Sequence, residues 1–368
     1  MILRKIDILN FKNIPECSLE FSEGVNCLLG MNGMGKSNLL EAVNFLCMAR
    51  PMSSMPESAL IRHGEDSMLV KGEFRADSDT DQKVACGIVE GKGKSLKLNG
   101  KEYPKISDHI GKFPVVAVTP SDSTLVTGGG EERRRLIDMV LSQADPAYLG
   151  ALIRYRRALD SRNRMLRSGF RDAILFESVE HTLEESAAYI HQARKEWIAA
   201  IRPRLKEIYS EIAGSAEKAS VSYRSQLNGK EMKELLDENR EKDRVLGYTS
   251  VGVHRDDMET TLGDYSMRRL GSQGQVKSFT IALRLAIFEY IRKISGLTPI
   301  LLLDDIFDKL DSSRVGRIMK MVSCPESFGQ IFITDTNREH LDEILRHLDG
   351  APRLFEVSNG TFTLIPTE

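Results

Sequence analysis

The stretch Gly30-Met-Asn-Gly-Met-Gly-Lys36-Ser37 decides the fold predicted for this chain. It matches the pattern Gly-x-x-x-x-Gly-Lys-Ser/Thr without a gap, and this pattern is typical of loops that bind phosphates. Its glycines let backbone N–H groups turn around phosphate oxygens, Lys36 supplies a positive charge, and the Ser37 hydroxyl is a ligand for Mg²⁺. The predicted nucleotide-binding residues are Gly30, Met31, Asn32, Gly33, Met34, Gly35, Lys36, Ser37 and Asn38.

The residues on either side of this loop have the pattern that the motif requires. Val25-Asn-Cys-Leu-Leu29 is a short apolar run between Gly24 and Gly30, which favours a buried strand. From Lys36 to Met48 the apolar residues recur at helical spacing. We therefore expect a strand, the glycine loop and a helix in succession, with the positive end of the helix dipole at the phosphates.

A second apolar run ends in two carboxylates, Ile300-Leu-Leu-Leu-Asp304-Asp305. A buried strand that ends in acid is typical of the element that holds Mg²⁺ in such ATPases, so Asp304 is the predicted metal-associated carboxylate. Asp305 is the predicted catalytic base, because it would accept a proton from the attacking water. Taken alone, an acid pair after an apolar run is a weak signal, because such pairs also serve as helix caps.

The third motif is Leu270-Gly-Ser-Gln-Gly-Gln275, which precedes a strongly apolar helical pattern. A hydroxyl and unobstructed N–H groups at a helix N-terminus favour a phosphate anion, although the same residues also form ordinary N-caps. The loop resembles the signature loop of ABC-type ATPases, which closes over the nucleotide of a second subunit. The predicted trans contacts are Ser272, Gln273, Gly274 and Gln275.

In this order, the three motifs resemble those of the RecF family, in the SMC-like branch of the ABC ATPases. The resemblance covers nearly the whole chain. The other matching blocks are Ile8 to Asn13, Leu60 to Gly64, Gly128 to Arg135, Arg162-Asn163, Gly252 to Asp257, and Leu303 to Asp311.

This resemblance implies an α/β fold: an ATPase lobe of the ABC and SMC-head type with an antiparallel β layer, plus an inserted helical lobe. It implies ATP and Mg²⁺ as cofactors, Lys36 and Asp305 as catalytic residues, and a homodimer that forms with ATP. It also implies binding to double-stranded DNA at single-strand junctions, and cooperation with RecR and RecO proteins in recombinase loading during DNA repair.

Some residues depart from the family pattern. Ser121 follows Pro120 where relatives commonly carry Glu, and Val253 stands where Pro is usual. Transporter ATPases carry a switch histidine after the next strand, whereas here that strand ends in Thr334-Asp-Thr336. Thr334 is a candidate sensor of the terminal phosphate.

Composition limits the other classes of protein. The 368 residues carry 51 basic and 53 acidic side chains, so a uniformly basic nucleic-acid coat is excluded. Five scattered cysteines without a Cys-x-x-Cys pair indicate neither zinc nor a disulfide framework. We expect a cytoplasmic protein without a membrane span, since no apolar run approaches ~18 residues.

The pattern also predicts the domain organisation. Residues 1–130 and 246–368 are assigned to a discontinuous ATPase lobe, with a β-rich layer over 66–118 and a hairpin at Asn99-Gly100. Residues 131–245 are predicted to form a helical insert lobe, with strand signals returning at 246–252.

Arginines between residues 154 and 171 form a predicted DNA-binding stripe. On a helical wheel, Arg156, Arg157, Arg164, Arg167 and Arg171 fall within an arc of about 100°. Such a stripe suits phosphates. The alternative is a solvated face, or ion pairs with the acidic segment Glu177–Glu185.

Two other functions are compatible with parts of the sequence. The ATP-binding subunit of a transporter fits poorly with the long insert and the absent switch histidine. A scaffold that binds nucleotide without hydrolysing it fits poorly with the acid pair Asp304-Asp305.

Overall fold

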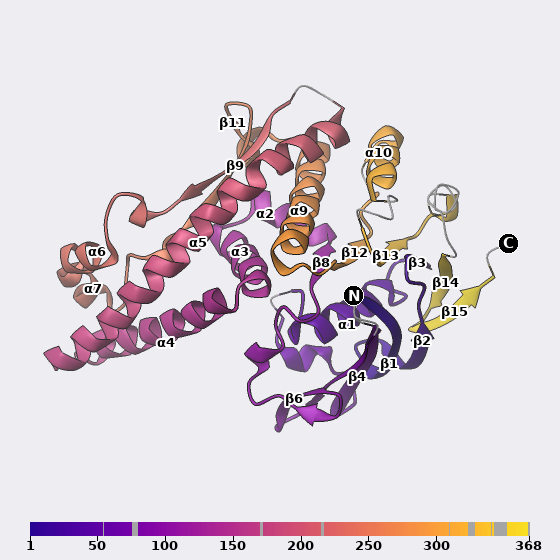
Figure 1. Ribbon diagram of the computed structural model, residues 1–368, viewed down its shortest axis with the longest axis horizontal. Coiled ribbons are helices and arrows are strands. Elements are labelled where there is room, and N and C mark those ends of the chain that lie inside the picture. The colour runs from indigo at the N-terminus through magenta and orange to yellow at the C-terminus, as the bar shows by residue number, and fades with distance from the viewer. Residues whose placement is uncertain are drawn as a thin grey trace. The chain divides into compact units, whose positions relative to one another are not determined.

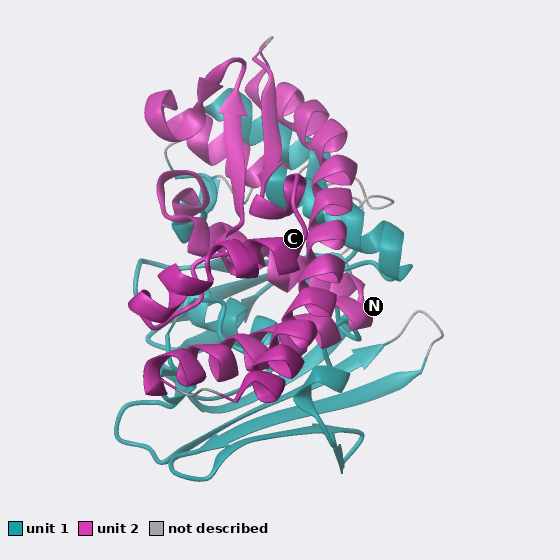
Figure 2. Ribbon diagram, turned by 90° about the vertical axis from the view of Figure 1, so that its left-hand side faces the viewer, with its two compact units in different colours: residues 1–122, 283–368 teal, residues 123–282 magenta. Residues whose placement is uncertain are grey.

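The computed structural model describes residues 1–53, 55–75, 80–169, 172–214, 217–308, 310–322, 328–339, 341 and 352–366. The chain divides into two compact units. Unit 1 contains residues 1–122 and 283–368, and unit 2 contains residues 123–282 (Figure 2). Within the described ranges, no helix is long and apolar enough to cross a membrane.

Unit 1 contains a mixed sheet with the strand order β15-β14-β3-β13-β12-β8 (Figure 1). The strands β3, β13, β12, β8 and β14 run parallel, and β15 pairs with β14 in the antiparallel sense. The central strands are apolar runs because both faces of this sheet are covered. Their bounds are Val25–Leu29 (β3), Ile331–Asp335 (β13), Ile300–Asp304 (β12), Val115–Val118 (β8), Arg353–Ser358 (β14) and Thr361–Ile365 (β15).

Unit 1 also contains an antiparallel sheet with the order β2-β1-β4-β5-β6-β7. The turn from β6 to β7 has Asn99 and Gly100 at φ 50° and 80°, which confirms the predicted hairpin. The strands are Ile2–Phe11 (β1), Ile14–Glu20 (β2), Ser67–Arg75 (β4), Asp81–Val89 (β5), Gly93–Leu98 (β6) and Lys101–Glu102 (β7).

The helix α1 (Lys36–Met48) begins directly after the glycine loop, as predicted. It contacts β1, β4 and β5 of the antiparallel sheet and β8, β12 and β13 of the mixed sheet, so it fills the space between the two. Its apolar side chains are buried on both sides, which fixes the position of its N-terminus. A shorter helix, α10 (Ser312–Val322), follows β12.

Unit 2 is mainly helical and carries a small antiparallel sheet of order β11-β10-β9. The helix α4 begins at an Asp145 N-cap followed by Pro146 and ends at Gly169 with φ 64°. The elements are α2 (Thr124–Thr127), α3 (Gly130–Ala144), α4 (Pro146–Ser168), α5 (Ala173–Ala213), β9 (Ala219–Arg224), α6 (Met232–Glu238), α7 (Arg240–Leu246), β10 (Asp257–Leu262), β11 (Tyr265–Ser266) and α8 (Met267–Leu270). The helix α9 (Gln273–Ser295) begins in unit 2 and continues into unit 1.

The structure differs from the predicted division at 131–245. Unit 2 extends to residue 282. Residues 257–262 belong to it because β10 pairs with β9 along its whole length, from Asp257↔Arg224 to Leu262↔Ala219. The strand β9 was not predicted within the helical segment, and the strand signal at 246–252 was wrong, since no strand occupies those residues. The returning strand is β10, which starts at Asp257.

Candidate nucleotide site

The glycine loop joins β3 to α1, at the carboxyl edge of the parallel strands. A Cβ on Gly30 would lie 2.4 Å from the backbone oxygen of Val357 on β14, and Gly35 has φ 115°. The sequence therefore needs glycine at both positions, for close approach at one and for a left-handed backbone at the other. The Asn13 side chain also supports the loop by donating to the Gly33 carbonyl at 3.3 Å and accepting from Asn38 at 2.7 Å.

Lys36 points back into this loop. Its ammonium donates to the carbonyls of Gly30 at 2.6 Å and Met31 at 3.0 Å. Burial lowers the pKa of Lys36, and the carboxylates of Asp305 and Asp304 oppose that shift. A cation hydrogen-bonded to neutral carbonyls is suited to exchange those partners for phosphate oxygens.

The predicted metal ligands meet in the structure. The Ser37 hydroxyl donates to Asp304 Oδ1 at 2.8 Å, and Asp304 is buried at the end of β12. Burial raises the pKa of Asp304, while the hydrogen bonds from Ser37 and Thr334 lower it. Mg²⁺ in nucleotide sites takes only one or two protein oxygens besides phosphates and water, so this hydroxyl and carboxylate fit the ion.

Thr334 lies beside the acid pair on the neighbouring strand. Its hydroxyl is buried, donates to Asp304 Oδ1 at 2.8 Å and accepts from the Asp305 N–H at 2.9 Å. Asp305 has φ 48°, an unfavourable value for a residue with a side chain, and this hydrogen bond holds it there. Thr334 therefore contacts the Asp304 carboxylate and the Asp305 backbone, which suits a positioning residue for the acid pair. Its predicted role as a sensor of the terminal phosphate stays a prediction.

The signature loop belongs to unit 2. Ser272 and Gln275 form a capping box at the start of α9: the Ser272 N–H donates to Gln275 Oε1 at 2.9 Å, and the Gln275 N–H donates to Ser272 Oγ at 3.2 Å. Gln275 also donates to Glu217 at 2.9 Å, which fixes the loop to unit 2. Ser272 and Gln273 are exposed, and Gly274 lies between them and Gln275 without a side chain to cover the helix N-terminus.

The predicted arginine stripe lies on α4. Arg157, Arg164 and Arg167 are exposed, whereas Arg156 donates to Asp138 at 3.0 Å while its side chain stays 62% exposed. Asp138 belongs to α3, so this ion pair does not involve the acidic segment at 177–185. Arg171 lies outside the described residues.

Other residues from the family-like blocks have structural contacts. Arg133 is buried and pairs with both oxygens of Asp257, and Arg134 donates to the Asp256 carbonyl. His254 Nε2 donates to the Thr249 carbonyl at 3.0 Å, so Nδ1 accepts from the Tyr155 hydroxyl at 2.7 Å. Burial lowers the pKa of His254 to about 4, which agrees with a neutral structural histidine.

Comparison with known proteins places these motifs in one family. The RecF/RecN/SMC N-terminal domain model matches residues 2–361. The DNA replication and repair protein RecF of Porphyromonas gingivalis is 47% identical over 98% of this chain and 99% of that protein, and RecF of Parabacteroides distasonis is 46% identical over 98% of both. The chain belongs to the RecF family. This membership confirms the predicted ATPase fold with an SMC-type head, and it assigns the chain to DNA replication and repair proteins.

Solved structures agree with that membership. The recombination mediator RecF with ATP, of the RecFOR pathway, has a TM-score of 0.89 at 28% identity, covering 99% of this chain and 98% of that one. The Smc head domain of Pyrococcus furiosus has a TM-score of 0.59 at 17% identity, with 99% and 96% covered. This second likeness shows a shared fold.

Proposed function

We propose that this RecF-family chain is an ATP-dependent recombination mediator whose ATP-bound homodimer holds duplex DNA at single-strand gaps. The observation that carries the proposal is the meeting of Ser37, Asp304 and Lys36 at one edge of the mixed sheet. Residues from the start of α1 and the end of β12 thus place a hydroxyl, a carboxylate and a cation around the same position. That is the arrangement that phosphoryl-transfer enzymes use for Mg²⁺-ATP.

Each residue has a chemical role in this proposal. Lys36 releases the Gly30 and Met31 carbonyls and binds phosphate oxygens, while Ser37 and Asp304 hold the metal. A bound Mg²⁺ neutralises charge that develops on the phosphates. Asp305 accepts the proton of the attacking water. The Thr334 hydroxyl holds the backbone of Asp305 in place by accepting a hydrogen bond from its N–H.

The signature loop supplies the reason for a dimer. Ser272 presents an exposed hydroxyl at the N-terminus of a long helix, where backbone N–H groups and the helix dipole favour an anion. In the proposed dimer, this loop binds the terminal phosphate of ATP held by the other subunit. Because hydrolysis removes the group that both subunits share, it releases the dimer from DNA, and slow hydrolysis acts as a timer.

The proposed partners follow from the family. We assign duplex DNA and single-strand junctions to the dimer, with the α4 arginines as contacts to the DNA backbone. RecR and RecO proteins are the expected partners in loading the recombinase, and the cytoplasm is the expected location. The scaffold alternative differs from this proposal in one property, since a scaffold would bind ATP without hydrolysing it.

The experiment measures ATP binding, ATP hydrolysis and DNA retention for wild type and Lys36→Ala. The variant should lose ATP binding and ATP-dependent retention of duplex DNA, because the phosphates lose their cation. Arg204→Gln, on α5 with a side chain that is 40% exposed, is the control and should match wild type. ATP-dependent DNA retention by Lys36→Ala would overturn the proposal, and ATP binding without any hydrolysis in wild type would favour the scaffold.

A further inference from the structure

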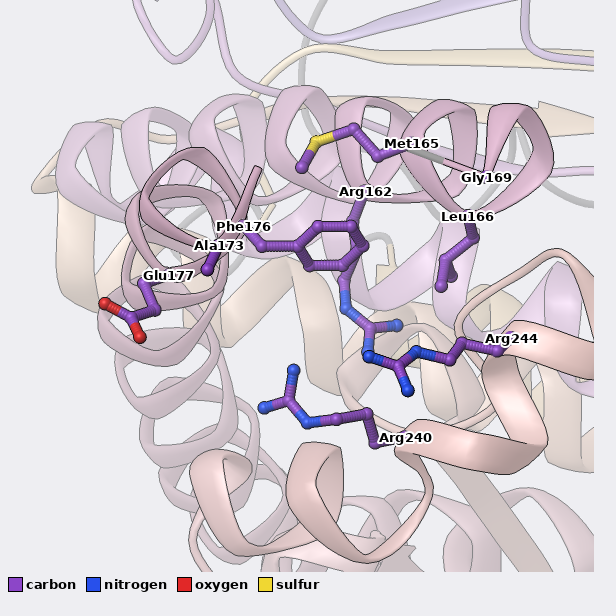
Figure 3. A pocket seen from close by; sticks show the side chains of 9 residues that line it. All are labelled: Arg162, Met165, Leu166, Gly169, Ala173, Phe176, Glu177, Arg240 and Arg244. Atoms are coloured by element: carbon purple, nitrogen blue, oxygen red, sulfur yellow. The ribbon is translucent and has the colours of Figure 1, made fainter. Parts of the chain in front are cut away.

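Unit 2 contains a pocket of about 630 Å³ that the nucleotide chemistry does not use. It lies where the end of α4, the start of α5 and α7 come together (Figure 3). Three arginines from two of these helices, Arg162, Arg240 and Arg244, point toward one another in it. Each of these arginines has a carboxylate partner among the described residues, so the question is what binds the guanidinium N–H donors that those partners do not use.

Arg162 is fully buried at this pocket and has unused hydrogen-bonding capacity. Its Nε donates to Glu180 at 2.9 Å, and its Nη1 donates to Asp243 at 2.7 Å and Thr249 at 2.9 Å. Among the described residues, its Nη2 has no hydrogen-bond partner. A buried donor without a partner costs about 1–3 kcal/mol, so an acceptor arriving here gains more than it would at the surface.

The other two arginines are more accessible. Arg240 pairs with Glu180 at 3.2 Å and Asp237 at 2.6 Å, and its side chain is 37% exposed. Arg244 pairs only with Glu241 among the described residues, at 2.6 Å, and is 61% exposed. A guanidinium has five N–H donors, so each retains donors for a further anion.

Apolar side chains also line the pocket. They include Met165, Leu166 and Phe176, and the Phe176 ring lies 6.0 Å from the Arg162 guanidinium. Next to the lining residues in sequence, Ile174 is 80% exposed and Val245 is 87% exposed. Apolar side chains in the lining and exposed aliphatic residues on the same helices favour a protein partner, since nucleic acid is bound mainly by basic and aromatic groups.

The surrounding charges favour a single carboxylate over a polyanion. Glu177 lines the same pocket, and the partners of the three arginines are themselves carboxylates. The described residues in and next to the pocket lining therefore lack the excess of positive charge that attracts a DNA backbone, unlike the exposed face of α4 that carries Arg157 and Arg164. Short-range hydrogen bonds to one anionic group remain favourable, because several guanidinium N–H groups converge there.

We infer that this pocket binds a segment of a partner protein that presents a carboxylate next to a large apolar side chain. The carboxylate accepts from Arg162, Arg240 and Arg244, and the apolar side chain packs on Met165 and Phe176. This site goes beyond the proposed function and does not depend on ATP. A negative result for peptide binding would therefore leave the proposed ATP-dependent dimer untouched, and the reverse also holds.

The test uses the full chain with methyl-labelled methionine, and Met165 is the reporter, assigned with Met165→Leu. Three probes are compared. The acidic peptide is short and alternates glutamate with leucine, and the glutamine peptide has glutamine in place of each glutamate. The third probe is a single-stranded oligonucleotide. We expect saturable shifts of the Met165 methyl resonance with the acidic peptide. The glutamine peptide should bind at least about tenfold more weakly, because it loses a charge-assisted hydrogen bond.

Two variants test the contacts. Arg244→Gln should weaken the acidic peptide about tenfold. Ala173→Glu places a carboxylate at the pocket and should abolish binding of the acidic peptide. The variant should still fold, because an acidic side chain in the first turn of α5 stabilises the helix N-terminus. Arg204→Gln, which changes a partly exposed helical arginine with the same kind of local ion pair, should bind like wild type. An unmoved Met165 signal, equal affinity for both peptides, or tighter binding of the oligonucleotide would overturn the inference.

Discussion

The Ser37 hydroxyl donates a hydrogen bond of 2.8 Å to Asp304 Oδ1, although 267 residues separate the two in the chain. Ser37 lies in the first turn of α1, and Asp304 ends β12. The two elements meet because parallel strands place their carboxyl ends, and the loops that follow them, at one edge of the sheet. The proposed metal position is therefore assembled by the fold of unit 1 itself.

Ser37→Ala should raise the Mg²⁺ concentration needed for half-maximal ATP hydrolysis by at least about tenfold, because one oxygen of the metal site is removed. Titrating Mg²⁺ at saturating ATP measures the effect. Ser37→Thr keeps the hydroxyl and serves as the control. The same Mg²⁺ dependence for wild type and the alanine variant would contradict the assignment of Ser37.

Thr334→Val should lower the rate of hydrolysis about tenfold or more while ATP binding changes little, because Asp304 and Asp305 both lose a hydrogen bond. Thr334→Ser keeps the hydroxyl and should restore most of the rate. Single-turnover hydrolysis beside equilibrium ATP binding separates the two effects. If valine supports the wild-type rate, Thr334 does not position the acid pair.

Gly30→Ala should abolish ATP binding, because its Cβ would meet the Val357 carbonyl at 2.4 Å and displace the loop. Gly129→Ala is the matched control, since no atom of the described residues lies within 4 Å of the added carbon. Calorimetric titration with ATP compares the two. Unchanged ATP affinity in Gly30→Ala would show that the close packing of β14 against the loop is not required.

Stability should fall in mildly acidic solution because His254 is buried in its neutral form. Burial lowers its pKa from the ordinary 6.5 to about 4, so between these values the unfolded chain binds the extra proton. The part of the free energy of unfolding that depends on neutral His254 is fully present above pH 6.5. It is lost at ~1.4 kcal/mol per pH unit down to pH 4. Urea unfolding across this range should show a smaller loss for His254→Gln, and equal losses would contradict the assignment.

Charge reversal at Arg157 and Arg164 should weaken DNA binding and make it less sensitive to salt. The slope of log affinity against log salt should fall by about one for each DNA phosphate that the protein no longer neutralises. Both side chains are exposed on α4 within the predicted arc. Arg154→Glu, an exposed residue of α4 outside that arc, is the control. An unchanged salt slope in the double variant would remove α4 from the DNA-binding surface.

The sequence predicted the elements whose residues carry strong local patterns. The glycine loop, α1 and β12 lie where their apolar periodicity indicated, and the RecF-family motifs predicted the fold class. The unpredicted elements depend on distant pairing. β9 is a short, largely polar strand that is defined by β10, and the β14–β15 hairpin is positioned by β3.

Side-chain contacts were harder to predict than elements. The support from Asn13 and the bridging hydroxyl of Thr334 depend on three-dimensional neighbours that no spacing rule specifies. Arg162 stood out in the sequence only as part of a family-like block, although it is the buried arginine of the unit 2 pocket. A buried polar residue has no periodic signal of its own, so only the structure distinguishes it from the exposed arginines of the same helix.

The most direct test of the central claim is light scattering of the chain with ATP and Mg²⁺, using Asp305→Asn to slow hydrolysis and the double variant Asp305→Asn/Ser272→Arg to block the signature loop. The account predicts an ATP-dependent dimer for Asp305→Asn and a monomer that still binds ATP for the double variant. A monomer in every condition, or a dimer that persists with Ser272→Arg, would contradict nucleotide binding shared between two subunits.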